Sequence, residues 1–236
     1  MSKVPQIMTV DKWRTPASEY PKSQVGNFRI HKVPYKQGLY HNWGVNDVDY
    51  FHTDNTLQIT VLQEFVQGKW CTWMVDDPPH WWSMQRYAAE ARGRVLVAGL
   101  GLGLFLHALS PRVRAGDVSS IILVERSPDV IELVRPLVPH ECLDIRTGDF
   151  YDYYRHAADF DFALIDLWVT NGSRQKEAVF NKYVMPLWAN MRFNYPAATL
   201  VFHGFTTVSD VHLWSEGFTP DVLEASRRRE DAGDNG

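Results

Sequence analysis

The sequence predicts an α/β fold, in which a doubly wound, mostly parallel sheet follows a small antiparallel β-meander. Between Arg94 and Phe205, short runs of Val, Ile and Leu alternate with segments of helical periodicity. This alternation is typical of a parallel sheet that is covered on both faces. Between Phe28 and Val75, strand-like runs follow one another across short turns. Such strands must pair mostly antiparallel, because a parallel crossover needs about a dozen residues or more.

The first part of the chain is expected to form an irregular arm and then the meander. Residues 1–25 contain Pro5, Pro16 and Pro21 and show no sustained period. After them, turn-forming residues separate short runs with strand chemistry. The expected strands are Phe28–Val33, Leu39–Trp43, Val48–Phe51, Leu57–Phe65 and Lys69–Val75.

Helical spacing begins near Trp81, and Gly93 is expected to end this first helix. Ser127 is expected to cap a later helix that has Pro128 at its first position. The order expected after Gly93 is strand Val95–Ala98, helix Leu102–Leu109 closed by Pro111, strand Ile121–Val124, the Ser127-capped helix up to Val138, strands Leu143–Arg146 and Phe162–Leu167, helix 174–192, and strand Thr199–Phe205.

Composition limits the class of protein and its surroundings. The chain has 236 residues, 45% of them apolar, which is enough for one core or for a core with a small appendage. A formal net charge of -4 gives no electrostatic reason to expect a nucleic acid or an acidic membrane as a partner. The start lacks the apolar segment of a signal peptide, and the run Val95–Leu109 is too short to span a bilayer. A soluble, cytoplasmic protein is therefore expected.

Three segments are expected along the chain. Residues 1–79 would form the arm and the meander, residues 80–226 the parallel-sheet domain, and residues 227–236 a disordered polar tail. The two cysteines, Cys71 and Cys142, lie far apart without metal-ligand spacing, so no metal site is expected.

A glycine-rich turn joins the first core strand to the first core helix. Gly99, Gly101 and Gly103 let the backbone pass close to a ligand, and the helix that follows points its free amides there. A dinucleotide-binding turn would have glycine where Leu104 stands. Glu125 ends the next strand, about twenty residues further on, where a carboxylate can accept both hydroxyls of a ribose. These residues indicate a nucleotide-cofactor site, and a tight turn without a ligand is the alternative.

The run from Val95 to Trp168 resembles the class I S-adenosylmethionine-dependent methyltransferases, and among them spermidine-synthase-like proteins. The resemblance is carried by VLVAGLGLGL, LVERSPDVIELVRP, RTGDF and DFALIDLW, in this order. It implies a Rossmann-like fold, apparently truncated at its C-terminal end, in residues 80–226. It also implies S-adenosylmethionine as the cofactor and in-line methyl transfer to an acceptor, which we expect to be a small molecule.

The resemblance also implies roles for single residues. Glu125 would hold the ribose, and Asp166 would face the reacting end of the cofactor, as a base or as a contact only. His203 follows an apolar strand, so it is expected at the carboxyl edge of the sheet, as a catalytic residue or as a structural histidine. The full set expected around the cofactor is Gly99, Leu100, Gly101, Leu102, Gly103, Glu125, Arg126, Asp149, Phe150 and Asp166.

Two other functions remain open at this point. Aminopropyltransferases share the fold and the amino-terminal hairpin, but Val169 stands where they carry a second aspartate. A binding or scaffold protein that has lost catalysis is the other alternative, because only about thirty residues follow Phe205 to close the sheet. A homodimer through an exposed meander edge is also possible.

One further motif has a plain structural interpretation. The tetrad that ends in His80, Asp-Pro-Pro-His, is similar to the D-P-P-aromatic motif of amino-directed DNA methyltransferases. Histidine replaces the aromatic residue, however, and the chain has no basic surface for DNA. A turn that enters the helix near Trp81 is therefore expected.

Overall fold

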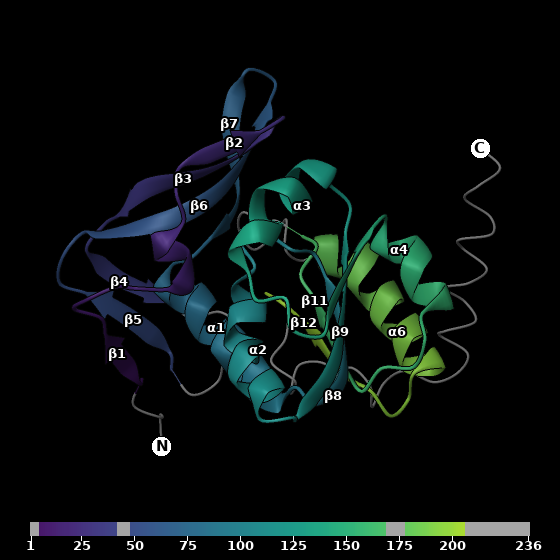
Figure 1. The fold of residues 1–236 in the computed structure, drawn as a ribbon. Helices are drawn as coiled ribbons and strands as arrows, with labels where there is room; N and C mark the ends of the chain where they lie inside the picture. The colour runs from purple at the N-terminus through teal and green to yellow at the C-terminus, as the bar shows by residue number, and fades with distance from the viewer. Residues whose placement is uncertain (1–4, 42–47, 169–177, 206–236) are drawn as a thin grey trace.

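The computed structural model describes residues 5–41, 48–168 and 178–205 (Figure 1). Within these ranges the strands form three sheets, one of them five-stranded and wholly parallel. The predicted α/β class, with a parallel sheet after antiparallel strands, is confirmed. None of the helices within these ranges is long and apolar enough to cross a membrane.

The parallel sheet has the strand order β10-β9-β8-β11-β12. The chain starts in the middle of this sheet, moves outward through β9 and β10, and then returns to the other side of β8. Ligands of open α/β sheets bind where the strand order reverses in this way, at the carboxyl ends of the strands. The strands are β8 (Gly93–Ala98), β9 (Val118–Glu125), β10 (Leu143–Thr147), β11 (Phe162–Ile165) and β12 (Thr199–Phe202).

Helices cover both faces of the parallel sheet (Figure 1). Residues of β8 alternate between two apolar clusters: Val95 and Val97 belong to the first, and Leu96 and Ala98 to the second. This alternation follows from the two-residue period of a strand. The first cluster contains residues of α1 (Pro78–Glu90), α2 (Leu104–Arg114) and α3 (Pro128–Val134), and the second contains residues of α4 (Phe150–Tyr153) and α6 (Met185–Asn194).

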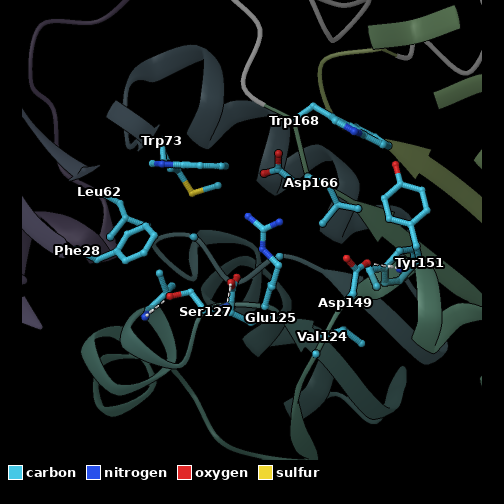
Figure 2. Close-up of a pocket in the computed structure, with 18 of the residues that line it drawn as sticks. Phe28, Leu62, Trp73, Val124, Glu125, Ser127, Asp149, Tyr151, Asp166 and Trp168 are labelled. Atoms are coloured by element: carbon cyan, nitrogen blue, oxygen red, sulfur yellow. Dashed lines mark hydrogen bonds between the residues drawn. The ribbon is translucent and has the colours of Figure 1, made fainter. Parts of the chain in front are cut away.

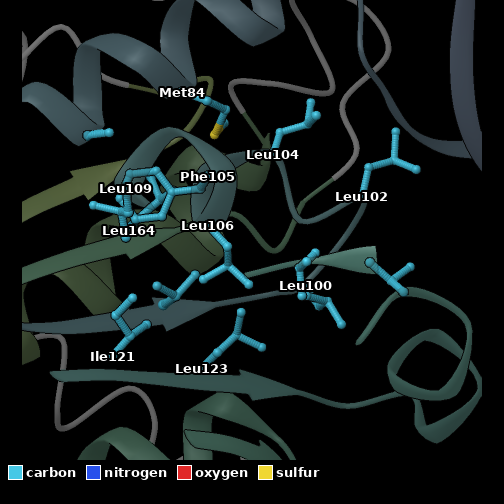
Figure 3. Close-up of a cluster of buried hydrophobic side chains, with 14 of the residues drawn as sticks. Met84, Leu100, Leu102, Leu104, Phe105, Leu106, Leu109, Ile121, Leu123 and Leu164 are labelled. Carbon is cyan, nitrogen blue, oxygen red and sulfur yellow. The ribbon is translucent and has the colours of Figure 1, made fainter. Parts of the chain in front are cut away.

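The first cluster places α2 firmly on the sheet (Figure 3). Leu104 and Leu109 of this helix are almost completely buried, and the ring of Phe105 stacks on that of Phe162 in β11 at 6.1 Å. Burial of each large apolar side chain contributes about 1.5–3 kcal/mol. The helix that follows the glycine turn is therefore held in place by packing, without a ligand.

The amino-terminal segment forms two small sheets, ordered β2-β3-β6-β7 and β1-β5-β4. The first is antiparallel throughout, as the meander predicts. The expectation of an irregular arm over residues 1–25 was wrong in part, because β1 pairs in parallel with the distant β5 and a 3-10 helix covers Pro16–Glu19. The strands are β1 (Ile7–Thr9), β2 (Ser23–Val25), β3 (Phe28–Tyr35), β4 (Gly38–His41), β5 (Tyr50–Thr53), β6 (Leu57–Val66) and β7 (Lys69–Val75).

A buried carboxylate ties the arm to the sheet. Asp76 is fully buried, and it accepts hydrogen bonds from the Thr15 hydroxyl (2.5 Å) and from the Thr60 backbone amide (2.6 Å). The ammonium of Lys32 donates to the Thr60 hydroxyl and to the carbonyl of Ala17. The arm is thus held by hydrogen bonds between buried polar groups. Removal of one group would leave its buried partner without a hydrogen bond, which is destabilising.

Several helix ends differ from the expectation. The first helix ends at Glu90, because Ala91 already has an extended conformation and Gly93 begins β8. Pro111 lies inside α2 and does not close it: its carbonyl still accepts from the amide of Ala115. A proline lacks only its own N–H, so the turn after it can continue.

The third core helix and two of the strands are shorter than expected. Ser127 caps α3 through its hydroxyl, as predicted, but the α-helix ends at Val134 and a 3-10 turn with Pro136 follows. The strands β11 and β12 end at Ile165 and Phe202. In the expected helix 174–192, residues 174–177 lie outside the described part; a π-helical turn, Phe180–Val184, precedes α6. The expected segment 206–226 and the tail 227–236 are likewise not described.

Candidate active site

A cavity of about 430 Å³ lies at the carboxyl ends of β8, β9 and β11. Sites for small molecules and cofactors have volumes of about 300–1,000 Å³. Figure 2 shows Phe28, Leu62 and Trp73 of the amino-terminal sheet on one side of it, and Tyr151 and Trp168 of the parallel-sheet domain on the other. The meander therefore covers the site, while the parallel sheet forms its floor.

Glu125 and the glycine turn meet at this floor. One carboxylate oxygen of Glu125 accepts from the amide of Leu100 at 2.9 Å, and the other accepts from the amide of Ser127 at 2.8 Å. These two bonds fix the carboxylate beside the turn, and it lines the cavity. Each oxygen keeps a further lone pair with which it could accept from a ligand hydroxyl.

The five residues expected from the glycine turn do not all lie at the cavity. Gly99 and Gly101 line it. The side chains of Leu100 and Leu102 point into the apolar core, with exposed fractions of 3% and 0% (Figure 3). Gly103 is the N-cap of α2, and a Cβ there would lie 2.2 Å from Cγ1 of Val138. In this structure the third glycine serves the packing of the helix.

Met74 of β7 covers part of the glycine turn. Its thioether sulfur accepts from the amide of Leu102 at 3.1 Å, and a Cβ on Gly101 would lie 2.3 Å from the same sulfur. Nothing in the sequence marks Met74 as a site residue, because methionine in a strand is an ordinary apolar residue. Only the hairpin β6–β7 could have indicated that some side chain from this part of the chain reaches the site.

Asp149, Phe150 and Arg126, which the resemblance expects around the cofactor, also line the cavity. Asp149 caps α4, and its carboxylate accepts from the amide of Tyr151 at 2.8 Å. Phe150 is buried behind it with an exposed fraction of 3%. Asp149 thus combines a structural hydrogen bond with a place in the lining of the cavity.

Asp166 follows β11 directly and lines the cavity. Its backbone amide donates to the carbonyl of Ala98, which holds the residue at the switch point between β8 and β11. Burial raises the pKa of Asp166, and the nearby His203 opposes this rise. A carboxylate with a raised pKa is a better proton acceptor near neutral pH than an exposed one.

His203 lies behind Asp166 and does not line the cavity itself. Its amide donates to the carbonyl of Ile165, so it stands at the carboxyl edge as expected. Its ring contacts the ring of His80 at 4.6 Å and that of Tyr87 at 5.9 Å, both from α1. His80, which the sequence places only in a turn, therefore belongs to the surroundings of Asp166.

The charges at the cavity favour a cationic ligand. Among the described residues, the carboxylates of Glu125, Asp149 and Asp166 line it, against one guanidinium, that of Arg126. Aromatic rings such as Trp73 and Trp168, which also line the cavity, attract cations through their faces. A pyrophosphate would meet mostly like charge here, whereas an adenosine that carries a positive sulfonium and an amino group fits this set of residues.

No protein-family model matches the chain, and no curated protein matches it. Partial overlaps exist with solved structures, two of which are described as candidate methyltransferases. A candidate SAM-dependent methyltransferase from Streptococcus mutans shares 16% identity over 45% of this chain and 29% of that one, with a TM-score of 0.31. MNMC2 from Aquifex aeolicus shares 15% identity over 47% of this chain and 46% of that one, with a TM-score of 0.31. SMU.776, a candidate methyltransferase complexed with SAH, shares 14% identity over 45% of this chain and 29% of that one, with a TM-score of 0.29.

These overlaps cover less than half of each solved chain. At such TM-scores they carry no argument about function. The doubly wound α/β class is defined by the sheet order of this chain itself.

Proposed function

We propose that the chain is an S-adenosylmethionine-dependent methyltransferase that acts on a small acceptor. The observation that carries this proposal is the position of Glu125, held by the Leu100 amide at the glycine turn and facing a cavity lined by two further carboxylates. The carboxylate of Glu125 can accept from ribose hydroxyls, and that of Asp149 from an adenine amino group. The cofactor supplies a methyl group on a positively charged sulfur.

The residues of the chain would then have separate tasks. Glu125 and Asp149 position the adenosine, which helps to hold the acceptor and the methyl carbon in line; such orientation can supply about 7–11 kcal/mol. Asp166 lies at the switch point, and its raised pKa suits it to accept a proton from the acceptor or to orient it. Phe28, Leu62 and Trp73 cover one side of the cavity with apolar surface. The acidic lining and the net charge of -4 favour a small acceptor over a nucleic acid.

Titration calorimetry tests the cofactor. We expect S-adenosylmethionine and S-adenosylhomocysteine to bind, and Glu125→Gln to weaken both at least tenfold, because a charged acceptor of hydrogen bonds contributes about 1.5–3 kcal/mol per bond. Glu90→Gln is the matched control, since Glu90 is exposed at the end of α1. Release of labelled methyl groups to a panel of small amines and hydroxyl compounds then tests the transfer itself.

The same titrations separate the alternatives. A preference for decarboxylated S-adenosylmethionine would favour aminopropyl transfer, for which the hairpin β6–β7 over the cavity is the supporting feature. Val169, on which that alternative depends in the sequence, lies outside the described residues. If none of the three compounds binds, the scaffold alternative replaces the proposal.

A further inference from the structure

Two histidines and a carboxylate from three distant parts of the chain meet beneath the cavity. His80 lies in the first turn of α1, Asp166 directly after β11, and His203 directly after β12. One ligand-type atom from each of the three lies within 4.8 Å of the other two. More than eighty residues separate His80 from Asp166 along the chain, so sequence spacing could not indicate this group.

Each of the two imidazoles has a nitrogen atom that no residue in the described part of the chain uses. Nε2 of His80 and Nδ1 of His203 are buried, and neither has a hydrogen-bond partner among the described residues. A buried polar atom without a partner costs about 1–3 kcal/mol. A structural histidine would be expected to bond to a neighbouring polar group, as His107 does to the hydroxyl of Tyr20. The unpaired nitrogens at one cluster therefore need an explanation.

We propose that His80, Asp166 and His203 bind a divalent transition-metal ion, of which Zn²⁺ is the simplest representative. Two imidazoles and one carboxylate are the ligand set of catalytic zinc sites, and of mononuclear iron sites. With metal–ligand bonds of about 2.0–2.2 Å, neighbouring ligand atoms of a tetrahedral site lie about 3.3 Å apart. The observed separations, at most 4.8 Å, reach this value through small side-chain rotations. Imidazole ligands make Mg²⁺ and Ca²⁺ unsuitable, since both prefer oxygen.

The position of the site indicates what an ion would do there. Asp166 lines the cavity, while the two histidines lie behind it, so a fourth coordination position would face the cavity. An ion with three protein ligands and one open position can bind a hydroxyl group and lower its pKa. This last step rests on the proposed methyl transfer, and in it Asp166 holds the ion instead of accepting the proton itself. It points to an acceptor with a hydroxyl group; metal binding does not depend on it.

The binding of Zn²⁺ and Co²⁺ to the chelator-treated full chain tests the site. We expect one ion per chain in calorimetry, and for Co²⁺ the visible absorption of a four- or five-coordinate site with nitrogen ligands. His80→Gln and His203→Gln should each weaken binding at least tenfold and remove this absorption. His107→Gln is the matched control, because His107 is also half-buried but bonds to Tyr20 and lies outside the cluster. It should bind the ion like the unchanged chain.

Further measurements distinguish the loss of the metal site from the loss of the fold. Circular dichroism checks that each variant folds, and Asp166→Asn, which keeps the shape of the side chain, gives a third route to the same site. Binding of neither ion, or equal binding by His80→Gln, His203→Gln and the unchanged chain, would overturn the metal site. Binding of S-adenosylhomocysteine by His80→Gln separates the two proposals, because His80 does not line the cavity. A metal site without cofactor binding would instead leave the methyltransferase assignment refuted and this inference intact.

Discussion

Replacement of Gly103 by alanine tests whether the third glycine of the turn serves packing. Gly103 has a φ of 68°, and a Cβ there would lie 2.2 Å from Val138 Cγ1. An alanine in the left-handed region costs about 1–2 kcal/mol, and overpacking against a buried β-branched side chain costs about 1–3 kcal/mol more. We therefore expect Gly103→Ala to lower the free energy of unfolding by about 2–5 kcal/mol.

Urea denaturation of matched variants separates these two costs. Gly116 has a φ of 80° and no atom within 4 Å of its would-be Cβ, so Gly116→Ala reports the backbone cost alone. In a double-mutant cycle, Gly103→Ala with Val138→Ala should be about 1–3 kcal/mol less destabilised than the sum of the two single changes. If Gly103→Ala costs no more than Gly116→Ala, or if the two changes are additive, Gly103 does not pack against Val138 and the reasoning is refuted.

Three other changes test the core, the buried carboxylate and the response to acid. Phe162→Ala should lower the free energy of unfolding by about 3–5 kcal/mol in urea titrations, whereas Leu39→Ala, at a side chain that is 56% exposed, should change it by less than about 0.5 kcal/mol; equal effects would contradict the assigned core. Asp76→Ala removes the acceptor of two buried hydrogen bonds, so the free energy of unfolding in urea titrations should fall by about 2–5 kcal/mol. An unchanged free energy of unfolding would show that these two hydrogen bonds do not hold the arm. Burial lowers the pKa of His107 from its usual 6.5. The imidazole therefore binds a proton more tightly in the unfolded chain than in the folded one, and the folded state loses stability as the pH drops through 6.5. Between about pH 7.5 and pH 5, the Tm of His107→Gln should therefore fall less than that of the unchanged chain. Parallel curves of Tm against pH would show that His107 does not contribute to the acid sensitivity.

The parts of the fold that depend on local signals could be predicted from the sequence. The apolar runs of β8 and β11 indicate buried parallel strands, and Ser127 caps α3 as its position before a proline predicts. Glu125 meets the glycine turn because adjacent parallel strands end at the same edge of the sheet. Such features need only the residue types and the order of the strands.

The features that depend on contacts between distant segments could not be predicted. The parallel pairing of β1 with β5 joins two short, weakly patterned segments. Met74 reaches the glycine turn, and His80 meets His203, only because the amino-terminal sheet and α1 pack on the parallel-sheet domain. The first two glycines of the turn line the cavity with their backbone, whereas the side chains of the leucines that follow them point into the core. The spacing of the residues alone does not predict in which direction these side chains point.

The apolar interior continues across the expected boundary between residues 79 and 80. Ala17, Tyr20, Ile30 and Leu62 belong to the same cluster as the residues that hold α2 on the parallel sheet. The hydroxyl of Tyr20 also donates to the carbonyl of Leu102, inside the glycine turn. Removal of the arm would strip apolar surface and a hydrogen-bond donor from the very loop that shapes the cavity. The two halves should consequently melt together as one cooperative unit, and a fragment that starts at α1 would be a poor substitute for the whole chain.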